Sequence, residues 1–203
     1  MIKTKRGHTT RQLIINKAAI LFTRNGYNHT SLAQILTATG LAKGGFYFHF
    51  KSKEELGLAV IESLEAYWRQ ELFPRMQRGK DAKEKIEIML SSPGDCYSTP
   101  ECIRPTILLL TLATEMIEVH DTFSQRLRQI FKEWWATLEE IIDEGKVAGI
   151  FKPNVDTHSV AAIILSNIMG ANLLALLNGD PGIYDKQLTS LKHALFQGIC
   201  LNQ

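Results

Sequence analysis

Helical spacing of apolar residues runs through almost the whole chain and constrains its fold more than any other feature. Between Thr10 and Asn25, and in several later stretches as far as Ile199, apolar residues recur every three or four positions, as on one face of an α-helix. No stretch alternates apolar and polar residues in the manner of a strand, and no internal repeat occurs. The sequence therefore predicts an all-α fold of about nine helices.

Capping signals predict where the first helices begin and end. Ser31 is followed three residues later by Gln34, a capping-box arrangement that opens a helix, and a second such pair begins at Ser52. Gly40 would end the helix that follows Ser31, because glycine readily adopts the left-handed conformation of a helix C-terminus. We therefore expect two short helices joined by a tight glycine turn, and then a longer helix that ends near Pro74.

Past Lys80 the spacing stays helical. Further helices are expected over 83–90, 107–117, 123–142, 157–179 and 186–199, with a loop over 91–105. The stretch 157–179 contains no charged residue, and its length would suffice to span a bilayer. Its asparagines and serines would be costly in hydrocarbon, so we expect a soluble-protein helix buried on all sides and no membrane segment.

The charges are unevenly distributed along the chain. Residues 1–53 contain nine lysines and arginines and no acidic residue, whereas the remaining 14 basic and 21 acidic residues give that part a formal charge of −7. A basic segment of this density suits a phosphate backbone, because each neutralised phosphate releases condensed counterions. A solvated basic surface or a membrane-facing patch is the alternative. The asymmetry favours double-stranded DNA as a partner of the N-terminal segment.

Two short helices joined by a glycine turn also match a helix-turn-helix, in which the second helix enters the major groove. The pattern alone is weak, because helix pairs are common in helical proteins. The segment 42–50 adds side chains that suit a groove, and it is too short and too polar to form a core. It combines a cation, two glycines and two polar aromatic side chains, namely Lys43, Gly44, Gly45, Tyr47 and His49.

The order of residues in this part resembles the DNA-binding domain of the TetR (tetracycline-repressor) family. The resemblance is carried by the runs Asn25-Gly26-Tyr27, Thr30 to Ile35, Thr39 to Gly44 and Phe46 to Leu56. It implies a three-helix DNA-binding domain over 8–68, with the helix-turn-helix at 31–50, and a larger ligand-binding and dimerisation domain over 69–203. Two positions depart from the family pattern: Ala42 replaces a common serine, and Gly45 a larger residue.

The resemblance also implies roles for individual residues. The DNA-contacting set would consist of Thr30, Ser31, Lys43, Gly44, Gly45, Tyr47, His49 and Lys53. Thr30 and Ser31 would also cap the second helix, and Lys53 would bind phosphate at a helix N-terminus. The last two helices, over 159–177 and 186–199, would pack against the same helices of a second copy. Such a two-fold homodimer predicts a pseudo-palindromic operator.

Aromatic and polarisable side chains are concentrated between the two ends of the chain. Such residues line apolar cavities for small-molecule effectors, although each of them could equally fill a core. The candidates for a ligand pocket are Trp68, Met89, Met116, His120, Phe123, Phe131, Trp134 and Trp135. His120 and Trp135 add polar groups beside apolar surface.

The sequence therefore predicts a ligand-released homodimeric repressor. A DNA-binding activator, or a module that recruits a protein partner without a small ligand, is the second interpretation. An enzyme on the helical scaffold is the third, but no nucleophile, base and orienting residue form a recognisable set. We accordingly expect no catalytic residue and no cofactor.

The three cysteines carry little chemistry by their spacing. Cys96 and Cys102 are separated by five residues, which matches no tight zinc-binding pattern, so no metal site is expected. A redox role for this pair is the alternative to two idle thiols. An odd number of cysteines excludes a disulfide framework, and the basic N-terminal segment lacks the apolar stretch of a secretion signal. We therefore expect a cytoplasmic protein.

Overall fold

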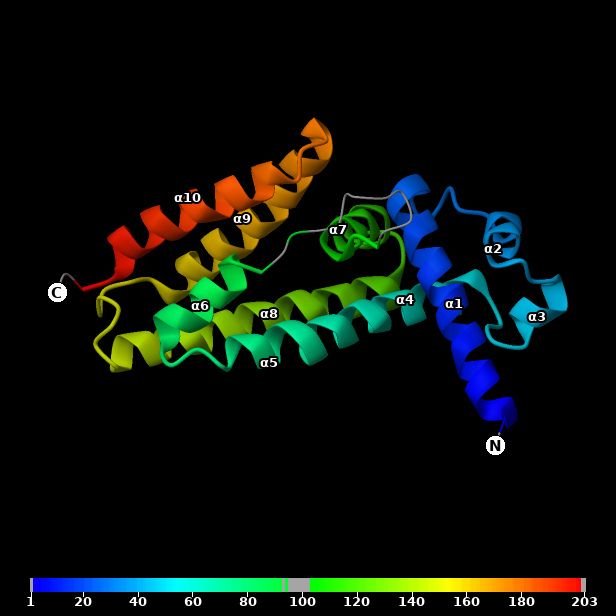
Figure 1. Ribbon diagram of the computed structural model, residues 1–203, viewed down its shortest axis with the longest axis horizontal. Helices are drawn as coiled ribbons and strands as arrows, with labels where there is room; N and C mark the ends of the chain where they lie inside the picture. The colour runs from blue at the N-terminus through cyan, green and yellow to red at the C-terminus, as the bar shows by residue number, and fades with distance from the viewer. Residues whose placement is uncertain (1, 93, 95–102, 202–203) are drawn as a thin grey trace. The chain divides into compact units, whose positions relative to one another are not determined.

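The structure, a computed structural model, describes residues 2–92, 94 and 103–201, with side chains from residue 9 onward. Cys96 and Cys102 lie outside the described residues. The elements in chain order are α1 (Ile2–Asn25), α2 (Leu32–Thr39), α3 (Lys43–Tyr47), α4 (Lys53–Tyr67), the π-helical turn η1 (Trp68–Leu72), α5 (Phe73–Met76), α6 (Ala82–Leu90), α7 (Pro105–Met116), α8 (Asp121–Val147), α9 (Thr157–Asn178) and α10 (Gly182–Ile199) (Figure 1). Because α4, η1 and α5 are continuous, the described residues form nine helices. The all-α prediction is confirmed.

The fourth helix, which the sequence predicts to end near Pro74, contains an irregular turn before its end. Between α4 and α5 the backbone takes a π-helical turn, in which the Phe73 N–H donates to the Trp68 carbonyl. Pro74 follows directly after this turn, at the second position of α5. The helix ends at Met76, two residues past Pro74, in agreement with the predicted end near Pro74.

The chain packs as two compact units. Unit 1 comprises Met1–Ala66 and Ser98–Leu127, and unit 2 comprises Tyr67–Tyr97 and Arg128–Gln203. Unit 1 thus holds α1 to α4, α7 and the start of α8, whereas unit 2 holds η1, α5, α6, most of α8, α9 and α10. The functional division into domains over 8–68 and 69–203 stays a prediction, because compact packing does not by itself assign function.

Unit 1 has a core of aromatic and aliphatic side chains, to which α1 contributes through its contacts with α2 and α7. The buried side chains include Ile14, Phe22, Tyr27, Ile35, Phe46, Phe50, Leu56 and Phe123. Because α2 and α3 span only eight and five residues, each can bury only a narrow face. This small core holds α3 in place through Phe46.

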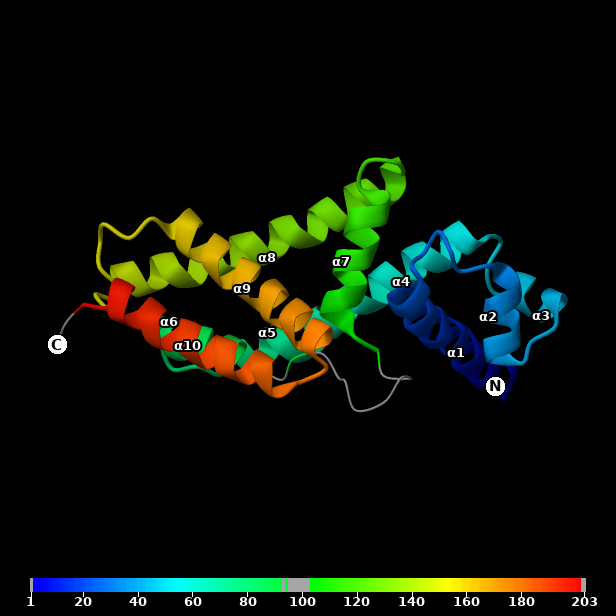
Figure 2. The same ribbon diagram turned by 90° about the horizontal axis from the view of Figure 1, so that it is seen from above.

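In unit 2, α9 and α10 lie side by side and form one core with α6 and part of α8 (Figures 1 and 2). The N-terminus of α9 is capped by Asp156, whose carboxylate accepts a hydrogen bond from the Ser159 N–H at 2.6 Å. That hydrogen bond lowers the pKa of the Asp156 carboxyl below its usual value. The helix thus begins where the sequence places a capping acid.

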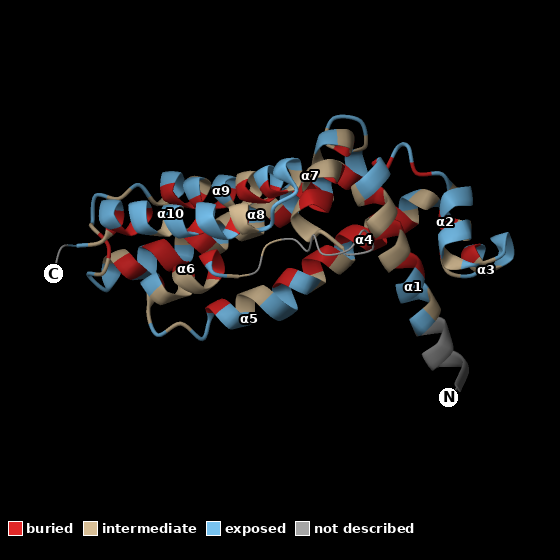
Figure 3. Cartoon of the chain, turned by 45° about the horizontal axis from the view of Figure 1, so that its top comes forward, coloured by how far each residue is buried: buried red, intermediate tan, exposed pale blue. Residues whose placement is uncertain are grey.

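The structure corrects the prediction that the uncharged helix is buried on all sides. One face of α9 packs in the core through residues such as Ile164 and Ala171, but Ile163, Leu173 and Leu177 are exposed. Figure 3 shows these exposed stretches on α9 in pale blue. Among the described helices α9 alone has the length and composition to cross a membrane, and 39% of its most apolar stretch is buried.

Candidate nucleic-acid interface

The helix-turn-helix is built by a capping box and a glycine turn. The Gln34 N–H donates to Ser31 Oγ at 3.2 Å, and the Ser31 N–H donates to Gln34 Oε1 at 2.7 Å. At the other end of α2, Gly40 has a φ of +67°, and its N–H bonds to the carbonyls of the last helical turn. This left-handed residue lets the chain turn within three residues into α3, as the sequence predicted.

The short helix α3 is anchored in the core by one side, and its other side is exposed to solvent. Phe46 has no exposed surface and lies against the ring of Phe50, with 5.9 Å between ring centroids. Lys43 and Gly44 are exposed, and a Cβ added at Gly44 would have nothing within 4 Å. Tyr47 is 47% exposed and packs edge-on against Phe46. A phosphate or a base edge can therefore approach this backbone closely.

The remaining predicted residues around α3 differ in their exposure. Gly45 and His49 are half-buried, and Ser31, at the start of α2, is exposed. Ala42 occupies the N-cap of α3 and makes no side-chain cap, so the departure from the family's serine removes a hydrogen bond there. Ser31, Lys43, Gly44 and Tyr47 thus form the open part of the predicted DNA-contacting set, and their contacts with DNA stay a prediction.

Thr30 and Lys53 are occupied inside the protein. Thr30 is buried, and its hydroxyl donates to the Gly26 carbonyl at 2.7 Å. The Lys53 ammonium donates to the carbonyls of Tyr27 and Thr30, at 2.7 and 2.8 Å. Burial lowers the pKa of Lys53, while the nearby Glu115 carboxylate opposes that shift. Both side chains brace the loop between α1 and α2, and their predicted contacts with DNA remain untested.

Sequence reasoning missed Phe48, at the end of α3. Its side chain is 81% exposed, and its ring packs edge-on against His49 at 5.0 Å between centroids. The signal was present in the spacing, because Phe46 and Phe50 are four residues apart and both buried, which turns Phe48 to the opposite side of a helix. A large apolar ring on this open surface is suited to stacking or methyl contacts in a groove.

The eight predicted pocket residues divide between the two units. Met116, His120 and Phe123 belong to unit 1, where His120 and Phe123 pack edge-on at 5.0 Å. The other five belong to unit 2, in which Trp134 contacts Trp68 at 4.0 Å and Phe131 at 5.9 Å between ring centroids. Trp135 stacks on His158 at 4.7 Å, and Met89 lies in the core of unit 2. Ligand binding by these residues stays a prediction.

One polar atom among these residues is unusual. The indole N–H of Trp135 is buried and has no hydrogen-bond partner within the described part of the chain. Such a group costs free energy when it stays unpaired, so its presence calls for an explanation. A bound molecule with a hydrogen-bond acceptor would satisfy it.

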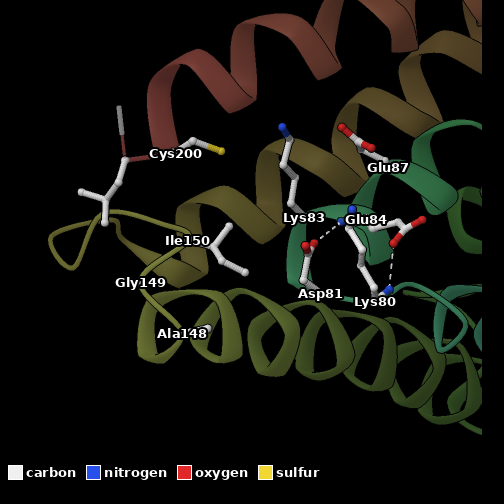
Figure 4. Close-up of a pocket in the computed structure, with 10 residues that line it drawn as sticks. Lys80, Asp81, Lys83, Glu84, Glu87, Ala148, Gly149, Ile150 and Cys200 are labelled. Atoms are coloured by element: carbon white, nitrogen blue, oxygen red, sulfur yellow. Dashed lines mark hydrogen bonds between the residues drawn. The ribbon is translucent and has the colours of Figure 1, made fainter. Parts of the chain in front are cut away.

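Unit 2 also contains a cleft of about 890 Å³ beside the N-terminus of α6 and the end of α10 (Figure 4). Half of its lining residues are charged, and the lining includes Lys83, Glu87 and Cys200 but none of the eight predicted pocket residues. Two of its acids are engaged with backbone: Asp81 accepts from the Glu84 N–H at 2.9 Å, and Glu84 accepts from the Lys80 N–H at 2.8 Å. No group of three metal-ligating side chains occurs within the residues described.

Two family models match the chain in order. The first, described as bacterial regulatory proteins of the tetR family, covers residues 14–60. The second, a tetracyclin repressor-like C-terminal domain, covers residues 101–191. The first match contains the second half of α1, together with α2 and α3, which form the helix-turn-helix.

Individual proteins agree with these matches. The chain is 30% identical over 132 residues to the HTH-type transcriptional regulator LmrA of Bacillus subtilis, covering 64% of this chain and 70% of LmrA. It is 24% identical over 194 residues to the HTH-type transcriptional repressor DhaR of a Mycobacterium species, covering 91% of each. A TetR transcriptional regulator from Chloroflexus aurantiacus has a crystal structure that matches with a TM-score of 0.81 at 27% identity, over 98% of this chain and 100% of that one. The chain therefore belongs to the TetR family of DNA-binding transcriptional regulators.

Proposed function

We propose that this chain is a homodimeric repressor that binds a pseudo-palindromic operator through α3 and is released from it by a small molecule. The observation that carries the proposal is the geometry of α3: Phe46 is fully buried, while Lys43, Gly44 and Tyr47 are exposed on the same short helix. A buried anchor fixes the helix, and its open side matches what a recognition helix needs in a major groove. The mycobacterial relative named as a repressor supports this sign of regulation.

The open face of α9 supports the homodimer. Along one side of this helix the exposed apolar residues are Ile163, Leu173, Leu174 and Leu177. A Cβ added at Gly170, within this stretch, would meet nothing within 4 Å, so a second helix can approach closely there. Several large apolar side chains exposed along one side of a helix are typical of a protein–protein interface. A second copy of the same face, related by a two-fold axis, would cover it.

The unpaired indole N–H of Trp135 supports a small-molecule effector. The rings of Trp68, Phe131 and Trp134 gather in the same unit, so an effector here would combine an apolar or aromatic body with one hydrogen-bond acceptor. An effector that prefers the conformation with displaced α3 helices lowers operator affinity by the same preference.

We also propose that the protein acts in the cytoplasm, with no catalytic residue and no resident cofactor.

The direct test is selection of duplexes from a random DNA pool on the purified protein, at physiological salt and without added ligand. We expect enrichment of one inverted repeat, because a two-fold dimer presents two α3 helices to two equivalent half-sites. Enrichment of a single, unrepeated half-site would contradict the dimeric part of the proposal. A folded, dimeric protein that enriches nothing would contradict operator binding by the free protein.

Substitutions on the open side of α3 test its placement on DNA. Lys43→Ala and Tyr47→Ala should each weaken binding to the selected operator about tenfold, since each removes a contact with phosphate or base. Fluorescence anisotropy at fixed salt measures the change. Lys80→Ala is the matched control, because it removes one positive charge from an exposed position in unit 2. Unchanged affinity in both α3 variants would refute the assignment of α3 as the recognition helix.

A further inference from the structure

The loop between α1 and α2, residues 26–30, is tied to the end of α7. The Asn28 N–H donates to Glu115 Oε2 at 2.9 Å, a hydrogen bond between residues 87 positions apart in the sequence. Both residues belong to unit 1, so this contact lies inside one compact body. Because the loop leads directly to Ser31, which caps α2, a carboxylate on α7 holds the entrance to the helix-turn-helix.

The other carboxylate oxygen of Glu115, Oε1, lies close to Gly26 in the same loop. Gly26 has a φ of +83°, and a Cβ built there would lie 2.1 Å from Glu115 Oε1. The carboxylate therefore occupies the space that any other residue's side chain would need. The backbone conformation favours glycine at this position, and any side chain there would displace the Glu115 carboxylate from the loop.

The same loop is held from its other side by aromatic packing. The ring of Tyr27 lies 5.1 Å from the rings of both Phe22 and Phe123, and Phe123 is fully buried at the start of α8. Gly57 makes room for this packing, because a Cβ there would lie 2.6 Å from Phe123 Cζ. The α1–α2 loop is thus fixed by a polar contact from α7 and an apolar contact from α8.

A lysine at the start of α4 also binds the α1–α2 loop. Lys53 donates to the carbonyls of Tyr27 and Thr30, and its ammonium lies 4.3 Å from the Tyr27 ring centroid. The carboxylate of Glu115 favours the charged form of Lys53 at this partly buried site. Glu115 therefore holds the loop through the Asn28 amide and lies near the lysine that binds the loop carbonyls.

We propose that Glu115 is a positioning residue for operator binding: it holds the α1–α2 loop, and through it α2 and α3, in the arrangement that fits DNA, without touching DNA itself. The inference rests on the proposed operator-binding function. Without Glu115 the loop would gain conformational freedom that has to be lost again on binding, so operator affinity falls.

The experiment compares wild type with Glu115→Ala, Glu115→Gln and Glu118→Ala. Glutamine keeps an acceptor for the Asn28 N–H, whereas alanine removes it. Glu118 is exposed and three residues farther along, so its alanine variant removes the same charge without loosening the loop. The readouts are operator affinity by anisotropy, hydrogen exchange of the Asn28 amide by NMR and thermal unfolding.

We expect Glu115→Ala to weaken operator binding about tenfold and to speed exchange of the Asn28 amide, with Glu115→Gln and Glu118→Ala within about twofold of wild type. The dimer and the order of preferred operator sequences should not change. A wild type that selects no operator contradicts the proposed function. A wild type that binds its operator while Glu115→Ala binds equally well or more tightly overturns the positioning role, as does an equal loss in Glu115→Gln.

Discussion

Replacing Phe46 with alanine is expected to lower the free energy of unfolding of unit 1 by about 3–5 kcal/mol, the usual cost of truncating a buried phenylalanine. Its ring is fully buried and contacts both Tyr47 and Phe50. Because α3 has only five residues, no second buried side chain within it can hold it in place. The variant should therefore lose operator binding together with the ordered structure of α2 and α3.

Chemical denaturation followed by circular dichroism measures this loss, and anisotropy measures the binding. Phe48→Ala is the matched control, because it makes the same substitution two residues away on a side chain that is 81% exposed. That control should unfold within about 0.5 kcal/mol of wild type. Equal destabilisation by the two substitutions would show that burial of Phe46 does not anchor α3.

The second large effect is expected on the open face of α9. The double substitution Leu173→Glu with Leu177→Glu places two carboxylates on each copy of this face, where they would meet their symmetry mates without partners. We expect a monomer at micromolar concentration. Operator affinity should fall about 100-fold or more, because two half-sites are no longer bound by one linked molecule.

Sedimentation or light scattering gives the oligomeric state, and the operator duplex gives the affinity. Val147→Glu serves as the control, since Val147 is 91% exposed at the end of α8 and lies outside α9 and α10. A double variant that stays dimeric would exclude this face as the interface. A monomer that keeps full operator affinity would separate dimerisation from DNA binding.

Local signals in the sequence were sufficient for the helix-turn-helix. The Ser31 capping box and the left-handed Gly40 depend on residues three or four positions apart, so their geometry follows from the chain itself. The spacing of Phe46 and Phe50 likewise identifies the inward side of α3. The same spacing also places Phe48 on the open side, although the composition of the segment drew attention to its polar residues instead.

Contacts between distant segments could not be read in this way. The lysine at position 53 follows a capping serine and looks free to bind phosphate, but its ammonium binds two carbonyls more than twenty residues earlier. The sequence of α9 has no charged residue, so it does not indicate which side of the helix packs in the core and which side is exposed. For the pocket residues, ring contacts such as Trp68 with Trp134 depend on packing between separate helices.

If a second copy covers the open side of α9, as proposed, the amount of folded protein also depends on the number of copies a cell makes. A fold completed only in a pair is stabilised by mass action, so its free energy of unfolding rises with the concentration of the chain. For such a dimer, low expression would bring more unfolding and faster proteolysis as well as fewer occupied operators. A shortened gene product that kept α9 and α10 but lacked α3 would pair with intact chains, and one defective gene copy would disable the product of a normal one.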